Sequence, residues 1–321
     1  MQDMHARQIR YLRLSVTPDC HMRCMYCRPA GSYGRNSRPL LSAGELVQLA
    51  SHLVRRHGVR KVRLTGGEPT ARGDLAEIIS RLSSIDGLEE LAMTTNGLTL
   101  ARDAALLRRK GLKRVNVSLD SLDAAVFAAI TGANALHLVL EGISAALAAG
   151  LPVKLNCVVL RGRNLDELPR LVAWAAARSL EIRFIELMPM GPLAGMWRRY
   201  FVSEAEMRRV LETCVAQWRP LARTTGAARR WEAVMHSGAR TVVGFISAMS
   251  CPFCDRCDRL RIGADGSVYP CLMDRPAGTL LEAVRPVFDA DRVDALLARW
   301  LRNKAAQHGP AGCGIMTGIG G

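Results

Sequence analysis

Residues 11–27 read YLRLSVTPDCHMRCMYC, a strand-like run followed directly by three closely spaced cysteines. The run YLRLSVT is typical of a β-strand, so Cys20, Cys24 and Cys27 stand on the loop that leaves the strand. Three thiolates can bind a metal centre and leave one position open, whereas four close the site. The stretch therefore predicts a [4Fe–4S] cluster with one exposed iron. The alternative is zinc, with a distant fourth ligand such as His21 or His5.

The same alternation of strand and helix continues to about residue 188. It predicts an α/β fold with a parallel sheet and right-handed crossovers. Such sheets gather their sites at the carboxyl ends of the strands, where GGEP (66–69), TTNG (94–97) and SLD (118–120) stand and where Glu186 and Met188 end the last run. This agreement favours a half-open barrel with one shared mouth over an open doubly wound sheet. The expected strands span residues 11–17, 61–66, 90–96, 114–120, 152–160 and 181–188.

After Met190 the alternation lapses, and we expect a second, smaller domain. The segment GPLAGMW indicates a loop, residues 203–215 a helix, and residues 220–250 an irregular or β region. A last helix is expected over residues 289–306. The expected domains are therefore residues 8–190 and 191–321.

The composition argues against several classes of protein. The 321 residues are 49% hydrophobic, but no stretch of about 18 uncharged apolar residues predicts a transmembrane helix. The N-terminus MQDMHARQIR has no apolar signal core, so we expect a cytoplasmic protein without a membrane partner. Ten cysteines in a reducing compartment indicate metal ligation rather than disulfides. A net charge of +15 could suit nucleic acid, but with only 5% aromatic residues base stacking has little support, and no nucleic-acid partner is expected.

A second cysteine group is Cys254, Cys257 and Cys271, again three potential ligands. Cys251 would add a fourth thiolate, so a closed zinc site or a fully ligated cluster is the alternative. Arg259 and Arg261 follow directly and point the same way if the segment is extended, which would let them bind a phosphate or stabilise a radical product.

Basic residues also stand inside the expected strands. Taken singly, each of them is expected to form a surface salt bridge. Five basic residues inside the strands of one barrel indicate more, because buried charges need partners, and a polyanion at the barrel mouth is one such partner. The residues are Arg13, Lys61, Arg63, Lys154 and Arg183.

The first cysteine spacing, Tyr26 before the last cysteine, and GGEP about forty residues downstream resemble the radical S-adenosylmethionine (SAM) superfamily. In that superfamily the glycine-rich turn lies against the methionine part of SAM. Cleavage of SAM at the open iron implies a 5′-deoxyadenosyl radical, so the cofactor carries the difficult chemistry.

Within this superfamily the chain resembles the GTP 3′,8-cyclase (molybdenum cofactor biosynthesis protein A) family from about residue 8 to the end. The further matching segments include IRFIELMPMG (182–191), FISAMSCPFCDRCDRLRIGADG (245–266) and the closing MTGIGG (316–321). The resemblance implies an incomplete (βα)6 TIM-type barrel whose mouth is closed by the C-terminal domain. It also implies two [4Fe–4S] clusters and SAM as cofactors.

The implied reaction is that of a lyase. Hydrogen abstraction at C3′ of GTP leaves a carbon radical that attacks C8 of guanine. Reduction and protonation then give 3′,8-cyclo-7,8-dihydro-GTP, in the first step of molybdenum cofactor (molybdopterin) biosynthesis. A homodimer, an electron donor such as flavodoxin or ferredoxin, and a downstream cyclic pyranopterin monophosphate synthase are the implied partners.

The resemblance also assigns residues. Cys20, Cys24 and Cys27 would bind the first cluster, and Cys254, Cys257 and Cys271 the second. Tyr26, Gly67, Ser118 and Met188 would contact SAM. The residues implied to surround GTP are Arg13, Lys61, Arg63, Thr94, Lys154, Arg183, Arg259, Leu260 and Arg261, with Gly320 and Gly321 of the tail reaching the site. Arg13, Arg259 and Arg261 are the expected catalytic residues.

Some positions depart from the family pattern, namely Cys251, Asp255–Arg256, Asp258 and the segment GPLAGMW. Two rival readings remain. One is another radical SAM enzyme with an auxiliary cluster, such as a peptide-modifying maturase or a paralogue with a different substrate. The other is a non-enzymatic zinc or nucleic-acid-binding protein.

Overall fold

The computed structural model describes residues 1–28, 39–224, 226–309 and 312 of the chain. Twelve strands in these residues form one sheet, ordered β12-β11-β10-β1-β2-β3-β4-β5-β6-β9-β8-β7. From β1 to β6 each strand pairs in parallel with the next one in the sequence. Each of the six expected runs thus contains a strand. Their bounds are Tyr11–Ser15, Lys61–Thr65, Glu90–Thr95, Arg114–Ser118, Val153–Val159 and Glu181–Glu186.

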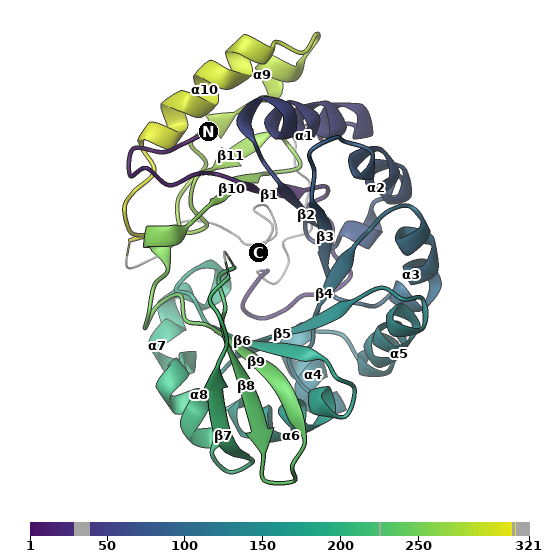
Figure 1. Cartoon of the computed structure of the whole chain (residues 1–321), viewed down its shortest axis with the longest axis vertical. Helices are drawn as coiled ribbons and strands as arrows, with labels where there is room; N and C mark the ends of the chain where they lie inside the picture. Colours follow the sequence, from purple (N-terminus) through teal and green to yellow (C-terminus); the bar gives the residue numbers. More distant parts are fainter. Residues whose placement is uncertain (29–38, 225, 310–311, 313–321) are drawn as a thin grey trace.

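Helices follow these strands and cover the outside of the curved sheet, as Figure 1 shows for α1, α2, α3 and α5. α1 begins after Ser42, whose side chain accepts from the backbone N–H of Glu45 while the Glu45 carboxylate accepts from that of Ser42. It ends at Gly58, which has a left-handed φ of 69° that glycine adopts without strain. The helices of this half are α1 (Ala43–His57), α2 (Leu75–Ser83), α3 (Leu100–Arg109), α4 (Ala124–Thr131), α5 (Leu136–Ala148) and α6 (Leu168–Ala176), with 3-10 turns η1 (Pro69–Ala71) and η2 (Leu165–Glu167).

The six strands curve around a common centre in Figure 1, with the first and last strands on different sides of it. Leu12, Leu64, Met93 and Leu155 of this sheet are fully buried, as expected for strands covered by helices. The partial parallel barrel predicted from the alternation is therefore confirmed. It brings the carboxyl ends of the strands to one mouth.

The residues after 190 extend the sheet at both of its edges. At one edge β9 (Arg240–Ile246) pairs in parallel with β6 and continues antiparallel into β8 (Arg229–Met235) and β7 (Val215–Pro220). At the other edge β10 (Arg259–Ile262) pairs in parallel with β1 and is followed by antiparallel β11 (Ser267–Tyr269) and β12 (Gly278–Thr279).

Three expectations for this half need correction. The GPLAGMW segment is not a plain loop, because it forms the turn η3 (Gly191–Met196) and begins α7 (Trp197–Tyr200). The helix expected over 203–215 is α8 (Glu204–Leu211), which ends early because Val215 already pairs with β8. The last helix, expected over residues 289–306, is α10 (Ala290–Arg302), which ends earlier and leaves Lys304 just beyond its end. The short elements η4 (Cys254–Arg256) and α9 (Leu281–Val284) complete the set.

Among the described residues, no single helix is long and apolar enough to cross a membrane. The pair α4 and α5 passes such a test only when the two helices are joined across a bend of 97°.

Candidate active site

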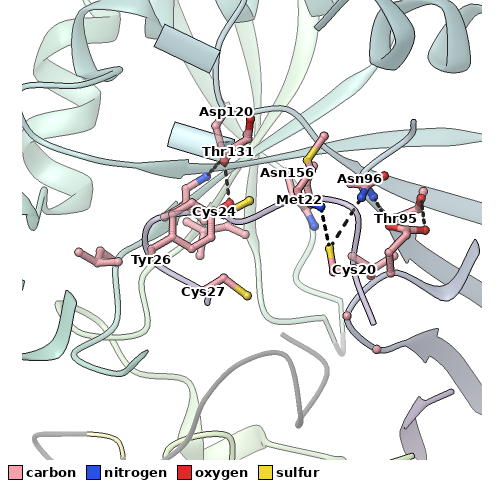
Figure 2. Close-up of a pocket in the computed structure, with 18 of the residues that line it drawn as sticks. Cys20, Met22, Cys24, Tyr26, Cys27, Thr95, Asn96, Asp120, Thr131 and Asn156 are labelled. Carbon is pink, nitrogen blue, oxygen red and sulfur yellow. Dashed lines mark hydrogen bonds between the residues drawn. The ribbon is translucent and has the colours of Figure 1, made fainter. Parts of the chain in front are cut away.

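Cys20, Cys24 and Cys27 lie together at the mouth of the barrel. Figure 2 shows the three side chains on one segment of chain at the edge of a cavity. This cavity encloses about 1120 Å³ of empty space, part of it open to solvent. The four residues expected to contact SAM also line it, together with Thr94, which was expected to contact GTP. Those four are Tyr26, Gly67, Ser118 and Met188.

The glycines of GGEP allow the cysteine loop to pack directly on β2. The backbone N–H of Gly67 donates to the carbonyl of Thr17 at 2.7 Å, and that of Glu68 donates to the carbonyl of Asp19 at 2.6 Å. A Cβ atom on Gly67 would lie 2.2 Å from the carbonyl oxygen of Asp19. No side chain fits at such a separation, so a glycine is required here to bring the two loops together.

A buried pair fixes the far end of the cysteine loop. The hydroxyl of Tyr26 donates to Oδ2 of Asp120 at 2.6 Å, and the backbone N–H of Val158 donates to Oδ1 at 2.8 Å. Burial raises the pKa of Asp120 to about 6, although both hydrogen bonds favour its charged form. The loop is also bound to α4, because the backbone N–H groups of Arg23 and Met25 donate to carbonyls at the end of that helix.

Two further buried polar groups face the cavity. The carboxylate of Glu68 accepts from the hydroxyl of Thr95 at 2.7 Å and from the backbone N–H of Asn96 at 2.6 Å, which holds the loops after β2 and β3 together. The side-chain oxygen of Asn156 is buried without a hydrogen-bond partner among the described residues. An unpaired buried acceptor at a cavity wall suits a bound ligand that donates a proton.

The thiols of this loop suit an iron–sulfur cluster better than one zinc ion. Zinc with Zn–S bonds of about 2.3 Å would bring tetrahedral sulfurs to within about 3.8 Å of each other. Among the described residues, neither cysteine trio has its sulfurs all within 4.8 Å of one another. Burial and the neighbouring thiol of Cys20 raise the pKa of Cys27 to about 12, and burial also raises that of Cys24. Such thiols stay protonated unless a cationic centre replaces the proton.

The second cysteine group lines a smaller cavity of about 500 Å³. Cys254, Cys257 and Cys271 face it, as do Arg259 and Arg261 of β10. Met188 lines both cavities, so the two sites adjoin at the end of β6.

Cations surround the thiol of Cys257. Burial acts to raise its pKa, yet Arg259 and Lys304 hold it at about 7. Cys251 is exposed and lines a different cavity with Arg229 and Ser247. Burial raises the pKa of Asp258, whose backbone carbonyl accepts from the start of β1.

Arginines stand in register on three neighbouring strands, and one of them, Arg261, lines the second cavity. Arg13 of β1 stands in register with Arg261 of β10 and with Arg63 of β2. Burial, and then the charge of Arg261, lowers the pKa of Arg13 well below its ordinary value. Burial and Arg259 lower the pKa of Arg261 to about 10. Crowded, desolvated guanidinium groups of this kind favour a polyanionic ligand.

Arg63 is the third arginine of the in-register strip that it forms with Arg13 and Arg261. It is 7% exposed, and its Nε has no hydrogen-bond partner among the described residues. Its guanidinium lies 5.5 Å from the centre of the Tyr11 ring.

The other expected GTP contacts are placed less uniformly. Lys154 and Arg183 both bind the carboxylate of Glu181, at 2.7 and 2.6 Å. Lys61 stands in register between Tyr11 and Glu90. Leu260 is 1% exposed and does not line either of these cavities. Gly320 and Gly321 lie outside the described residues.

Sequence reasoning missed several residues of this site. Glu68 and Asp120 belong to the motifs GGEP and SLD, but the motifs gave no sign that their carboxylates bind other loops. Asn156 and Lys304 carried no recognisable signal, because their neighbours come from distant parts of the chain.

A separate cluster of potential metal ligands joins α1 to α10. Nε2 of His52 and Nε2 of His57 lie 2.6 and 2.5 Å from Oδ1 of Asp294, and Nε of Arg56 lies 2.7 Å from Oδ2. Tetrahedral ligands of a metal with bonds of about 2.1 Å stand about 3.4 Å apart. These shorter distances are those of hydrogen bonds, so we interpret the cluster as a set of hydrogen bonds that joins the two helices.

Comparisons with known proteins identify the family. A family model of the radical SAM superfamily matches residues 14–175, and one of the molybdenum cofactor synthesis C-terminal region matches residues 180–310. The GTP 3′,8-cyclase of Paenarthrobacter nicotinovorans is 42% identical over 94% of this chain and 89% of its own length. That of Moorella thermoacetica is 40% identical over 96% of this chain and 95% of its own length. The chain belongs to the GTP 3′,8-cyclase family of radical SAM proteins.

Among solved structures, Streptococcus suis SuiB bound to S-adenosylmethionine is similar, with a TM-score of 0.63. The likeness covers 95% of this chain and 72% of SuiB at 15% identity, so it supports the fold alone. In this GTP 3′,8-cyclase family member, the two adjoining cavities are each lined by three cysteines. Arg13, Arg63 and Arg261 stand in register on the neighbouring strands.

Proposed function

We propose that this chain is a radical SAM GTP 3′,8-cyclase, a lyase that converts GTP to 3′,8-cyclo-7,8-dihydro-GTP in the first step of molybdenum cofactor biosynthesis. The observation that carries the proposal is the adjacency of two cavities, each lined by three cysteines and sharing Met188. The family membership selects this reaction over that of a peptide-modifying maturase.

The first cavity would hold a [4Fe–4S] cluster on Cys20, Cys24 and Cys27. Bound there, the cluster would supply the electron that cleaves SAM, and this cleavage would give methionine and the 5′-deoxyadenosyl radical. The cavity's own residues bind and orient: Gly67 leaves room against the cysteine loop, and Ser118 and Met188 border the space for SAM. Tyr26 lies 7% exposed against Asp120 and closes this side of the cavity to water.

The second cavity would hold a second [4Fe–4S] cluster on Cys254, Cys257 and Cys271. Arg13, Arg259 and Arg261 are the proposed catalytic residues, since they would contact the substrate itself. The in-register trio Arg13, Arg63 and Arg261 would bind the triphosphate, whose several negative charges offset their mutual repulsion. Thr94, Lys61, Lys154, Arg183 and Leu260 remain proposed neighbours of GTP.

Other parts of the proposal rest on the family alone. They are a homodimer, a tail reaching the site through Gly320 and Gly321, and a flavodoxin- or ferredoxin-like electron donor. The proposed domain boundary near residue 190 rests instead on the end of the strand–helix alternation. A cyclic pyranopterin monophosphate synthase would take the product onward. We place the protein in the cytoplasm, where GTP is available and thiols stay reduced.

An anaerobic incubation with SAM, GTP and a strong reductant tests the proposal. We expect about eight irons per chain after reconstitution, since two four-iron clusters are proposed, and a cyclised GTP product alongside 5′-deoxyadenosine. Formation of 5′-deoxyadenosine without cyclised GTP would remove the substrate assignment. Zinc in place of iron would remove the radical mechanism as well.

A further inference from the structure

Lys304 is a buried lysine beside Cys257 of the second cavity. It follows α10 directly and is 2% exposed. Burying an ammonium group is costly unless its protons are bound. The reason for its burial must therefore lie among its contacts.

Its hydrogen-bond acceptors belong to Cys257 of the second cysteine group and to Arg259, the first residue of β10. Nζ of Lys304 donates to the carbonyl of Arg259 at 2.8 Å and to that of Cys257 at 3.4 Å. It also lies 3.6 Å from Sγ of Cys257, within the range of a hydrogen bond to sulfur. An ammonium has three protons, so these three acceptors satisfy it and fix its direction.

The position of Lys304 is itself fixed from two sides. On one side, the last turn of α10 is anchored by its own buried side chains, Trp300 and Leu301. On the other side Arg7 is 7% exposed and paired with Asp3, and its guanidinium donates to the carbonyls of Cys254 and Ala305, both at 2.7 Å. The N-terminal segment and the segment after α10 thus hold the Cys254–Cys257 loop between them.

We propose that Lys304 is a positioning residue for the second cluster, which holds the Cys257 thiolate by a charged hydrogen bond and raises the cluster's reduction potential. The inference rests on the proposed function, because it requires a cluster on Cys254, Cys257 and Cys271. Hydrogen bonds to ligand sulfurs and nearby charge are among the factors that set such potentials. A buried cation stabilises the reduced, more negative state of the cluster more than the oxidised state.

A redox titration of the second cluster alone tests this role. The background is the full chain with Cys20→Ala, Cys24→Ala and Cys27→Ala, reconstituted anaerobically and followed by EPR. With Lys304→Met we expect the equilibrium constant for one-electron reduction to fall about tenfold, a decrease of 59 mV. Lys304→Arg keeps the charge and should stay within about threefold of the parent. Arg302→Met, an exposed residue of α10, is the matched control.

The outcomes distinguish the presence of the second cluster from the role of Lys304. Iron bound with the same potential in Lys304→Met and Arg302→Met overturns the role of Lys304 and leaves the second cluster in place. Absence of iron in the background chain with Lys304 intact overturns both the second cluster and the role of Lys304.

A second measurement does not depend on Lys304→Met. In background chain labelled with 15N-lysine, pulsed EPR of the reduced cluster should detect a 15N coupling that Lys304→Arg abolishes. A cluster signal without such a coupling overturns the proposal independently of the potentials.

Discussion

The hydroxyl of Tyr26 and the carboxylate of Asp120, 94 positions apart in the chain, form a 2.6 Å hydrogen bond at the wall of the first cavity. Tyr26 belongs to the cysteine loop, whereas Asp120 follows β4. Both are less than a tenth exposed. The bond therefore ties the loop that would hold the first cluster to the opposite side of the barrel mouth.

Replacing Tyr26 with phenylalanine should loosen this loop. The change leaves a buried carboxylate oxygen without its donor, which typically costs about 1–3 kcal/mol. We expect a decrease of that size in the free energy of unfolding, measured with urea, and lower iron retention during gel filtration. Tyr200→Phe is the control, since Tyr200 is equally buried but its hydroxyl makes none of the hydrogen bonds found among the described residues. Equal losses in the two variants would contradict the importance of the bond.

Alanine at Gly67 should separate the cysteine loop from β2. Its Cβ would lie 2.2 Å from a backbone oxygen, so the two loops must move apart. We expect Gly67→Ala to lose most SAM binding, measured by equilibrium dialysis of the reconstituted protein. Gly73→Ala, where a Cβ would meet nothing within 4 Å, should bind SAM as the parent does. Tight SAM binding by Gly67→Ala would show that the loops can rearrange.

The barrel could be predicted because its strands are local and strongly patterned. Parallel strands buried on both faces are rich in Val and Leu, as KVRLT in β2 is, and each is followed by an amphipathic helix. The cysteine trios and Arg259 with Arg261 were also visible, because their spacing is short.

The pairings that complete the site could not be predicted in this way. The pairing of β10 with β1 places Arg261 beside Arg13, but no local pattern indicates which strand a distant segment will join. Lys304 contacts Cys257 across 47 positions, and a single lysine after a helix reads as a surface residue. Long-range polar contacts carry no periodicity, so only the folded chain shows them.

The bond between α1 and α10 gives a dependence of stability on pH. Burial alone would raise the pKa of Asp294, but its hydrogen bonds with His57 and His52 hold it at about 2. A carboxylate with a lowered pKa stabilises the fold above its unfolded pKa of about 3.9 and loses that contribution as the pH falls towards 2. After allowance for solvent screening, we expect Asp294→Asn to cost about 1 kcal/mol at pH 7.

The difference between parent and Asp294→Asn should shrink as urea unfolding is repeated between pH 5 and pH 3. Asp291→Asn is the matched control, because Asp291 lies on the same helix with its carboxylate 94% exposed. A difference that stays constant over this range would show that the lowered pKa does not contribute to stability.

Replacing Arg63 with methionine should weaken GTP binding without weakening the fold. The guanidinium is buried beside other cations, and burial lowers its pKa, so the ligand-free protein gains little from the charge. A triphosphate would supply the missing anion, and losing one such contact costs about 1.4 kcal/mol or more. We expect the KM for GTP to rise about tenfold, with SAM affinity and the melting temperature of the ligand-free protein unchanged or higher. Arg60→Met, on the exposed side of the same strand's start, should leave the KM unchanged. An Arg63→Met enzyme with the parent's KM would place the triphosphate elsewhere at the barrel mouth.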